Sequence, residues 1–139
     1  MIIAAEYSFK NGRQVVEDRW SSLLLEIEDT IATLESSLYR TKLSREKTMV
    51  DRMLYNPSSM NRFLSEAFER QGWSKQRVRA EYPTEYYRKG YVPRVLRPGA
   101  FREMDFVKDK LGLEIQFGKY AFMVYNVCAK MTIFHNMDS

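Results

Sequence analysis

The chain has 139 residues, of which 45% are hydrophobic and 29% charged, and its formal net charge is +4 at pH 7. This length predicts a single domain over residues 1–139 with a real hydrophobic core. The sequence holds no run of about twenty apolar residues and no charged and then apolar leader, so we expect neither a membrane span nor a secretory signal, and a cytoplasmic protein. Cys128 is the only cysteine and His135 the only histidine, which excludes an internal disulfide and a zinc site of several cysteines.

The N-terminal part of the chain predicts a strand followed by a long helix. Residues 2–9 are mostly apolar and β-compatible, and the Asn11-Gly12 pair that follows is typical of a turn. From Gln14 to about Ser37 apolar residues recur at spacings of three and four, with acidic residues between them. We interpret this segment as an amphipathic helix that packs on a sheet.

Residues 39–57 show no sustained period and are expected to form a loop with at most one helical turn. Four basic residues crowd this segment, namely Arg40, Lys42, Arg45 and Lys47. Such a cluster fits contacts with the phosphates of a nucleic acid, and a solvated surface loop is the competing explanation.

A second helix is expected to begin near Ser58 or Ser59, whose hydroxyl groups suit an N-cap, and to end at Gly72. Residues 73–100 contain three prolines and are expected to be irregular, apart from a short strand at residues 78–82. Basic residues cluster here a second time, as Lys75, Arg77, Arg79, Arg88, Lys89, Arg94, Arg97 and, just beyond, Arg102.

Residues 104–120 predict a β-hairpin that carries an acidic site. In the second arm four apolar residues alternate with polar or small ones, so that Glu114 and Gln116 share one face. A turn near residues 108–110 would bring Asp105 beside Glu114. Two close carboxylates that face outward fit a divalent cation, and a site made of oxygens suits Mg²⁺ better than Zn²⁺.

After the hairpin, residues 120–134 are apolar almost all the way round and predict a helix that is covered on both sides. In a protein of this size we expect a partner subunit to supply the second cover.

The spacing of Asp105 and Glu114-Ile115-Gln116 resembles the PD-(D/E)xK nuclease motif, in the variant that has Gln in place of Lys. Its surroundings are similar to the BglII/BstYI family of type II restriction endonucleases, and most of all to the BstYI branch. The matching segments are Asp105-Phe106-Val107-Lys108-Asp109 and Glu114-Ile115-Gln116-Phe117-Gly118-Lys119-Tyr120, and earlier Arg40-Thr41-Lys42, Ser44, Glu46-Lys47-Thr48, Leu54-Tyr55 and Gly72-Trp73.

This resemblance implies an α/β fold of the restriction-endonuclease type, in which helices flank a mixed central sheet. It also implies a homodimer that cuts double-stranded DNA with Mg²⁺ by means of a metal-activated water. The expected target is a palindrome with a GATC core, of the purine-GATC-pyrimidine class. Members of the family continue beyond the position of Ser139, so we expect the fold to be incomplete at its C-terminus.

The resemblance further implies roles for individual residues. Asp105 and Glu114 fall on the metal ligands, with the main-chain carbonyl of Ile115 as a third. Gln116 takes the place of the catalytic lysine and would orient the attacking water, because an amide is neither a cation nor a proton-transfer group. At the start of the apolar helix the main-chain amides would lie on a phosphate and the Lys119 amine would point toward a purine acceptor such as guanine O6 or N7. A surface lysine without such a contact is the alternative.

Two other functions stay open at this point. One is a DNA-binding or dimerising fragment without turnover, and the other is a PD-(D/E)xK repair nuclease without sequence preference.

Overall fold

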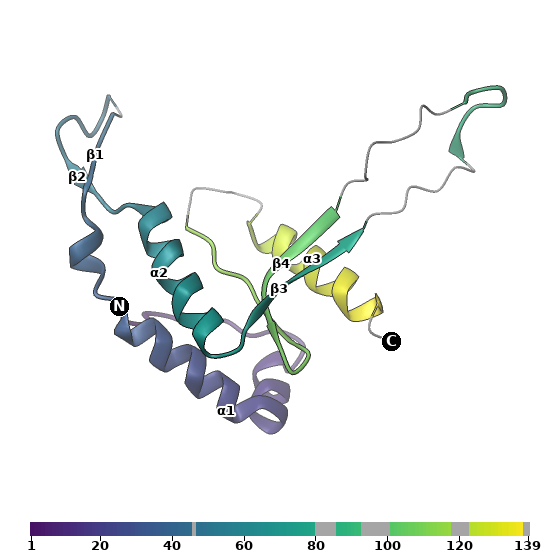
Figure 1. Ribbon diagram of the computed structural model, residues 1–139, viewed down its shortest axis with the longest axis horizontal. Helices are drawn as coiled ribbons and strands as arrows, with labels where there is room; N and C mark the ends of the chain where they lie inside the picture. Colours follow the sequence, from purple (N-terminus) through teal and green to yellow (C-terminus); the bar gives the residue numbers. More distant parts are fainter. Residues whose placement is uncertain (46, 80–85, 93–100, 118–122, 138–139) are drawn as a thin grey trace. The chain divides into compact units, whose positions relative to one another are not determined.

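The computed structural model describes the chain except for residues 46, 80–85, 93–100, 118–122 and 138–139 (Figure 1). Its contacts divide the chain into two compact units, each of which is described by itself. The first unit comprises Met1–Trp73, and the second comprises Ser74–Gln116 together with the C-terminal helix. That residues 1–139 form one domain stays a prediction. No helix in the described part of the chain is long and apolar enough to cross a membrane.

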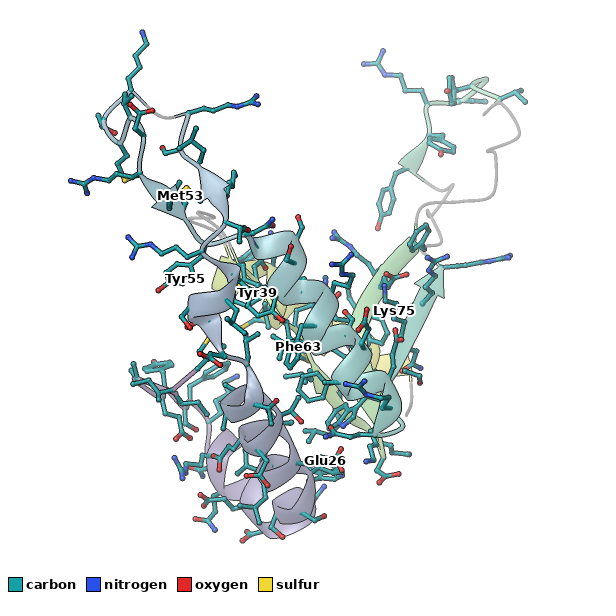
Figure 2. All side chains as sticks on the ribbon, turned by 60° about the vertical axis from the view of Figure 1, so that its left-hand side comes forward. Glu26, Tyr39, Met53, Tyr55, Phe63 and Lys75 are labelled. Atoms are coloured by element: carbon teal, nitrogen blue, oxygen red, sulfur yellow. The ribbon has the colours of Figure 1, made fainter. Side chains whose placement is uncertain are left out.

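The first unit is mainly helical. In chain order its elements are α1 (Gly12–Thr33), the 3-10 helix η1 (Ser36–Tyr39), β1 (Lys42–Leu43), β2 (Met53–Leu54) and α2 (Pro57–Arg70). Helix α2 contacts both α1 and η1. Where α2 meets η1, the ring centres of Tyr39 of η1 and Phe63 of α2 lie 6.1 Å apart (Figure 2). The buried apolar side chains of this unit are Leu23, Leu34, Met60, Leu64, Ala67, Phe68 and Trp73.

Trp73 joins the two long helices of this unit. Its ring packs edge-on against Phe68, with 5.8 Å between the ring centres, and its indole Nε1–H donates to the Glu26 carboxylate of α1. The largest side chain of this core therefore has its polar atom satisfied while its ring is almost fully buried.

The strand predicted for residues 2–9 is wrong. These residues are exposed and pair with no strand in the described part of the chain. The Met1 ammonium instead donates to the Leu34 carbonyl beyond α1. The predicted first helix is confirmed, with Gly12 as its first residue and Thr33 as its last in place of Ser37.

The segment between η1 and α2 was expected to be a loop, but it contains two short strands. Strands β1 and β2 pair antiparallel, with Lys42 opposite Leu54 and Leu43 opposite Met53. The Ser44 N–H extends this hairpin by donating to the Arg52 carbonyl at 2.8 Å. The basic residues of this segment therefore lie on or beside a small hairpin.

Helix α2 confirms the second predicted helix but not its cap. Pro57 occupies the first helical turn, and the side chain of Asn56 accepts from the Ser59 N–H at 3.3 Å. At the other end Gly72 takes φ of 88° and its N–H donates to the Glu69 carbonyl at 3.1 Å, as expected for a glycine that ends a helix. The residue that caps α2 is thus Asn56, because it precedes the proline that begins the helix.

Replacing Asn56 by Ala is expected to lower the free energy of unfolding by about 1 kcal/mol, because the Ser59 N–H loses its acceptor. Ser58→Ala is the matched control, since Ser58 is exposed inside the helix and Ala is a better helix former. Urea unfolding of both variants measures the difference. A larger loss for Ser58→Ala than for Asn56→Ala would contradict this assignment of the cap.

The second unit is a three-stranded antiparallel sheet with one helix. Its elements are β3 (Ser74–Arg79), β4 (Phe101–Lys108), β5 (Leu111–Leu113) and α3 (Met123–Met137), and the strand order is β3-β4-β5. Strand β3 begins earlier than the predicted strand 78–82, whose last residues lie outside the described part of the chain. The α/β class predicted from the sequence is confirmed, and the elements are consistent with a restriction-endonuclease-like fold.

The predicted hairpin is confirmed as β4–β5. Lys108 pairs with Leu111, so the turn consists of two residues, Asp109 and Lys110, which take φ of 49° and 66°. Positive φ at both positions is the type I′ geometry that suits the twist of a hairpin. The second arm is shorter than predicted, because β5 ends at Leu113 and the residues up to Phe117 are not in a strand.

Helix α3 packs against this hairpin. A Cβ placed on Gly112 would lie 3.2 Å from the sulfur of Met131, so β5 and α3 approach closely here, and a side chain at position 112 would make the Met131 side chain shift. Phe134 of the helix is buried, as are Met104 and Phe106 of β4. The predicted apolar helix is thus confirmed, and its residues Tyr125 and Ile133 are exposed.

Candidate active site

Asp105 and Glu114 lie opposite each other on the two arms of the β4–β5 hairpin. Phe106 pairs with Leu113, and continuing that register by one residue brings Asp105 to Glu114. The Asp105 N–H donates to Glu114 Oε2 at 3.2 Å, and the Ile115 N–H donates to Asp105 Oδ2 at 3.2 Å. Each carboxylate is therefore held by the backbone of the opposite arm.

The electrostatics of this pair are unfavourable for an anion at Asp105. Burial raises the pKa of the Asp105 carboxyl, and the neighbouring charge of Glu114 raises it further. The hydrogen bond from Ile115 and the charges of Lys130 and Lys75 act in the opposite direction but do not cancel the rise in pKa. The site thus keeps two carboxylates close together in a partly desolvated position, where a further cation would be stabilising.

Lys130 brings a cation to this pair from helix α3. Its Nζ forms an ion pair with Glu114 Oε1, and the side chains of Lys130 and Glu114 are 22% and 8% exposed. The sequence interpretation missed this residue. The signal that would have found it is its isolation, because Lys130 is the only charged residue among positions 123–134.

A basic row on β3 lies on the same face of the sheet as Asp105. Arg77 pairs directly with Glu103 of β4, and the two side chains form an ion pair. Lys75, labelled in Figure 2, lies 3.7 Å from the same Glu103 carboxylate and also lowers the pKa of Asp105. The Arg77 guanidinium lies 4.6 Å from the centre of the Phe101 ring. Cations of the second basic cluster therefore adjoin the acidic pair.

The other residues predicted for this site have simpler positions. Ile115 follows Glu114 and donates its N–H to Asp105, while the Gln116 side chain is exposed. Lys119 lies outside the described residues. The structure therefore brings together Asp105, Glu114 and Ile115, with Gln116 next in the chain.

The donor set of the pair fits Mg²⁺. Among the described residues no group of three or more His, Cys, Asp or Glu side chains gathers as a metal site. Mg²⁺ does not need one, because it is usually held by one or two carboxylates and keeps several waters. The partly buried carboxylates of Asp105 and Glu114, which repel each other, are oxygen ligands of this kind.

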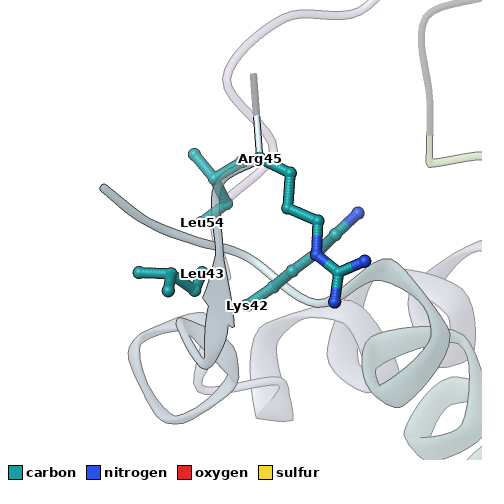
Figure 3. Close-up of a pocket in the computed structure, with 4 residues that line it drawn as sticks. All are labelled: Lys42, Leu43, Arg45 and Leu54. Carbon is teal, nitrogen blue, oxygen red and sulfur yellow. The ribbon is translucent and has the colours of Figure 1, made fainter. Parts of the chain in front are cut away.

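Two residues of the first basic cluster, Lys42 and Arg45, line an open hollow on the β1–β2 hairpin of the other unit. Lys42, Leu43, Arg45 and Leu54 line this hollow (Figure 3). Arg40 is turned toward its own hairpin, where its Nε–H donates to the Met53 carbonyl at 3.0 Å, and Lys47 is exposed. The hollow thus combines two cationic side chains with two apolar ones.

Comparison with known proteins identifies the class to which this chain belongs. The family model for restriction endonuclease BglII/BglIII matches residues 4–139. This match makes the chain one of the restriction endonucleases, which are type II site-specific DNA nucleases that bind DNA and typically use divalent metal ions. The chain belongs to the BglII/BglIII family of these enzymes. No curated protein matches it.

Asp105→Asn is expected to make the metal-free protein more stable at neutral pH. A pKa that is higher in the folded than in the unfolded state means that ionised Asp105 opposes folding at pH values above that folded-state pKa. The advantage of Asn should disappear as the pH falls below the ordinary range of an aspartate, because the wild-type carboxyl is then protonated in both states. The amide oxygen of Asn can still accept from Ile115.

Thermal unfolding in EDTA at several pH values tests this expectation. A variant that is less stable than the wild type at neutral pH, or whose advantage is the same at all pH values, would contradict it.

Proposed function

We propose that the chain acts as a Mg²⁺-dependent type II restriction endonuclease, which hydrolyses phosphodiester bonds of double-stranded DNA at a palindrome with a GATC core. The observation that carries this proposal is the Asp105–Glu114 pair, held by the hairpin backbone in a chain that matches the family over residues 4–139. The metal, the ExQ form of the PD-(D/E)xK motif and the kinship to the BstYI branch are parts of the proposal.

In this proposal Asp105, Glu114 and the Ile115 carbonyl hold the metal ion. A Mg²⁺ ion bound there would supply Lewis acidity, which polarises the phosphate and lowers the pKa of water. The residues of the chain supply positioning. The amide hydrogen bonds fix one oxygen of each carboxylate. The second oxygen of Asp105 would then be a ligand, and that of Glu114, which is paired with Lys130, would become one when the ammonium moves away.

Gln116 has the role of orienting water. It lies two residues after Glu114, and its exposed amide has both a donor and an acceptor for a water molecule. Because an amide carries no charge, Gln116 cannot offset the charge that develops on the phosphate. That electrostatic work must come from other groups of the site.

Contacts with the DNA backbone are assigned to the basic residues. Arg40, Lys42, Arg45 and Lys47 belong to one unit, and the row with Lys75 and Arg77 belongs to the other. Both groups suit phosphates, which position a duplex without reading its sequence. Base reading is assigned to Lys119, with guanine O6 or N7 as its acceptor. The GATC core rests on the resemblance to the BstYI branch.

A homodimer follows from the symmetry of the target. A palindrome presents the same half-site twice, which a two-fold dimer matches. The apolar residues Tyr125 and Ile133 of α3 are exposed, and a second copy that packs on this helix would cover them.

Incubation of plasmid DNA with the chain and Mg²⁺ is expected to give discrete fragments. Glu114→Gln and Asp105→Ala should lower the rate of cleavage by about 10³-fold or more, because each removes a charged metal ligand. Glu66→Gln is the matched control, since Glu66 is an exposed acid on α2, which belongs to the other unit. Sequencing of the cut ends defines the recognition site.

Other results of this digestion favour the other functions. DNA binding without cleavage would indicate a binding or dimerising module, and a smear in place of discrete bands would indicate a nuclease without sequence preference. Cleavage that survives Asp105→Ala would contradict the assigned active site.

Neutralising both cations of the hollow, as in Lys42→Gln with Arg45→Gln, is expected to weaken DNA binding and its dependence on salt. The slope of log K against log salt should fall by about 0.9 for each phosphate that the protein no longer neutralises. The charge-matched control is Lys10→Gln with Arg62→Gln, which changes exposed residues of the same unit outside the hairpin. Equal slopes for the two double variants would contradict a role of the hollow in phosphate binding.

A further inference from the structure

We propose that Lys130 is a catalytic cation of the acidic site and that it supplies from helix α3 the positive charge that Gln116 cannot supply from the hairpin. This inference rests on the proposed nuclease function and deepens it.

The contacts of Glu114 carry the inference. One of its oxygens, Oε2, accepts from the Asp105 N–H, and the other, Oε1, is paired with the Lys130 ammonium. The backbone of the hairpin and the side chain of α3 thus share the two oxygens of one carboxylate. Lys130 therefore lies at the atom of Glu114 that the backbone leaves available to a metal ion.

Burial makes this contact different from a surface ion pair. Glu114 is 8% exposed and Lys130 22%, whereas Arg13 and Glu6, which pair near the N-terminus, are both about half exposed. Exposed pairs contribute little, while a charge that is mostly withdrawn from water depends on its partner. The backbone next to Lys130 is held in place, because the side chain of the following residue, Met131, packs against Gly112 of β5.

The chemistry of the site calls for such a cation. Negative charge on the phosphate oxygens rises during hydrolysis, and a positioned cation stabilises it. Lysine is suited to this task because its ammonium has three donors on a flexible four-carbon stem. Lys75, the other lysine near the pair, already lies 3.7 Å from Glu103.

Lys130 then has two successive contacts. In the metal-free protein it pairs with Glu114 and counterbalances the acidic pair. It must leave Oε1 before this oxygen can serve as a metal ligand, and its stem allows the ammonium to reach a phosphate held at the same place. Loss of Lys130 therefore has effects of opposite sign, with tighter metal binding before DNA is present and weaker action on DNA afterwards.

The test compares Lys130→Met, which removes the charge, with Lys130→Arg, which keeps it, and with Lys10→Met as the control. Lys10 is an exposed lysine of the first unit, outside the active-site hairpin and both basic clusters. The first measurement is titration of the metal-stripped protein with Mn²⁺ by calorimetry, without DNA. Lys130→Met is expected to bind Mn²⁺ about 5-fold to 10-fold more tightly than the wild type, because the competing cation is gone.

The second measurement is made on DNA. With Ca²⁺ and a duplex that contains the recognition site, Lys130→Met should bind more weakly and lose about one unit of salt slope. With saturating Mg²⁺ its rate of cleavage should fall about 10²-fold, with Lys130→Arg between it and the wild type. Lys10→Met should match the wild type in all three measurements.

The outcomes separate this inference from the proposed function. If the wild type binds Mn²⁺ and cuts DNA but Lys130→Met binds Mn²⁺ no more tightly, or cuts at the wild-type rate, the role of Lys130 is disproved and the nuclease function stands. A lysine with a merely structural role would weaken metal binding and cleavage together. If Lys130→Met does not fold, Lys130→Gln takes its place with the same expected signs. A wild type that neither binds Mn²⁺ nor cuts DNA disproves both.

Discussion

The two hydrogen bonds that join Asp105 to Glu114 and Ile115 are the interaction on which the candidate site depends. They exist only in one register of the β4–β5 hairpin, since a slip by one residue would turn Glu114 to the opposite face of the sheet. The register is set by the two-residue turn at Asp109 and Lys110, which places both residues in the left-handed region although neither is glycine. A small conformational cost in the turn thus fixes the geometry of the carboxylates.

Without a bound cation, the two neighbouring carboxylates make the electrostatic energy of the site unfavourable. Desolvation and mutual repulsion raise the pKa of Asp105, while Lys130, Lys75 and the Ile115 amide oppose the rise. The fold stabilises two like charges by distributing countercharge over strand β3 and helix α3. This is the expected state of a site that is prepared for a cation, and it explains why the local electrostatics are unfavourable in the part of the chain that carries the function.

Local patterns in the sequence predicted the hairpin, because alternation and turn residues act over a few positions. They failed where the structure of a segment depends on a contact with residues distant in the sequence. Residues 2–9 have β-compatible side chains, but a strand needs a neighbour to pair with, and none pairs with them in the described part of the chain. Lys130 contacts Glu114 across sixteen positions, and the packing of α3 on the hairpin brings them together. Motif spacing identified the carboxylates, whereas their countercharge needed the fold.

Because Lys130 is on helix α3 and not on the hairpin that carries the carboxylates, its position depends on how this helix packs. The geometry of a strand lysine is fixed by the sheet that also carries the carboxylates, whereas the place of Lys130 depends on how α3 lies on β5. The same helix exposes Tyr125 and Ile133, the residues for which we propose a second copy as cover. A partner that packs on this face of α3 would also hold Lys130 next to Glu114. In a dimeric enzyme, dimer formation would therefore affect the electrostatics of cleavage through helix α3.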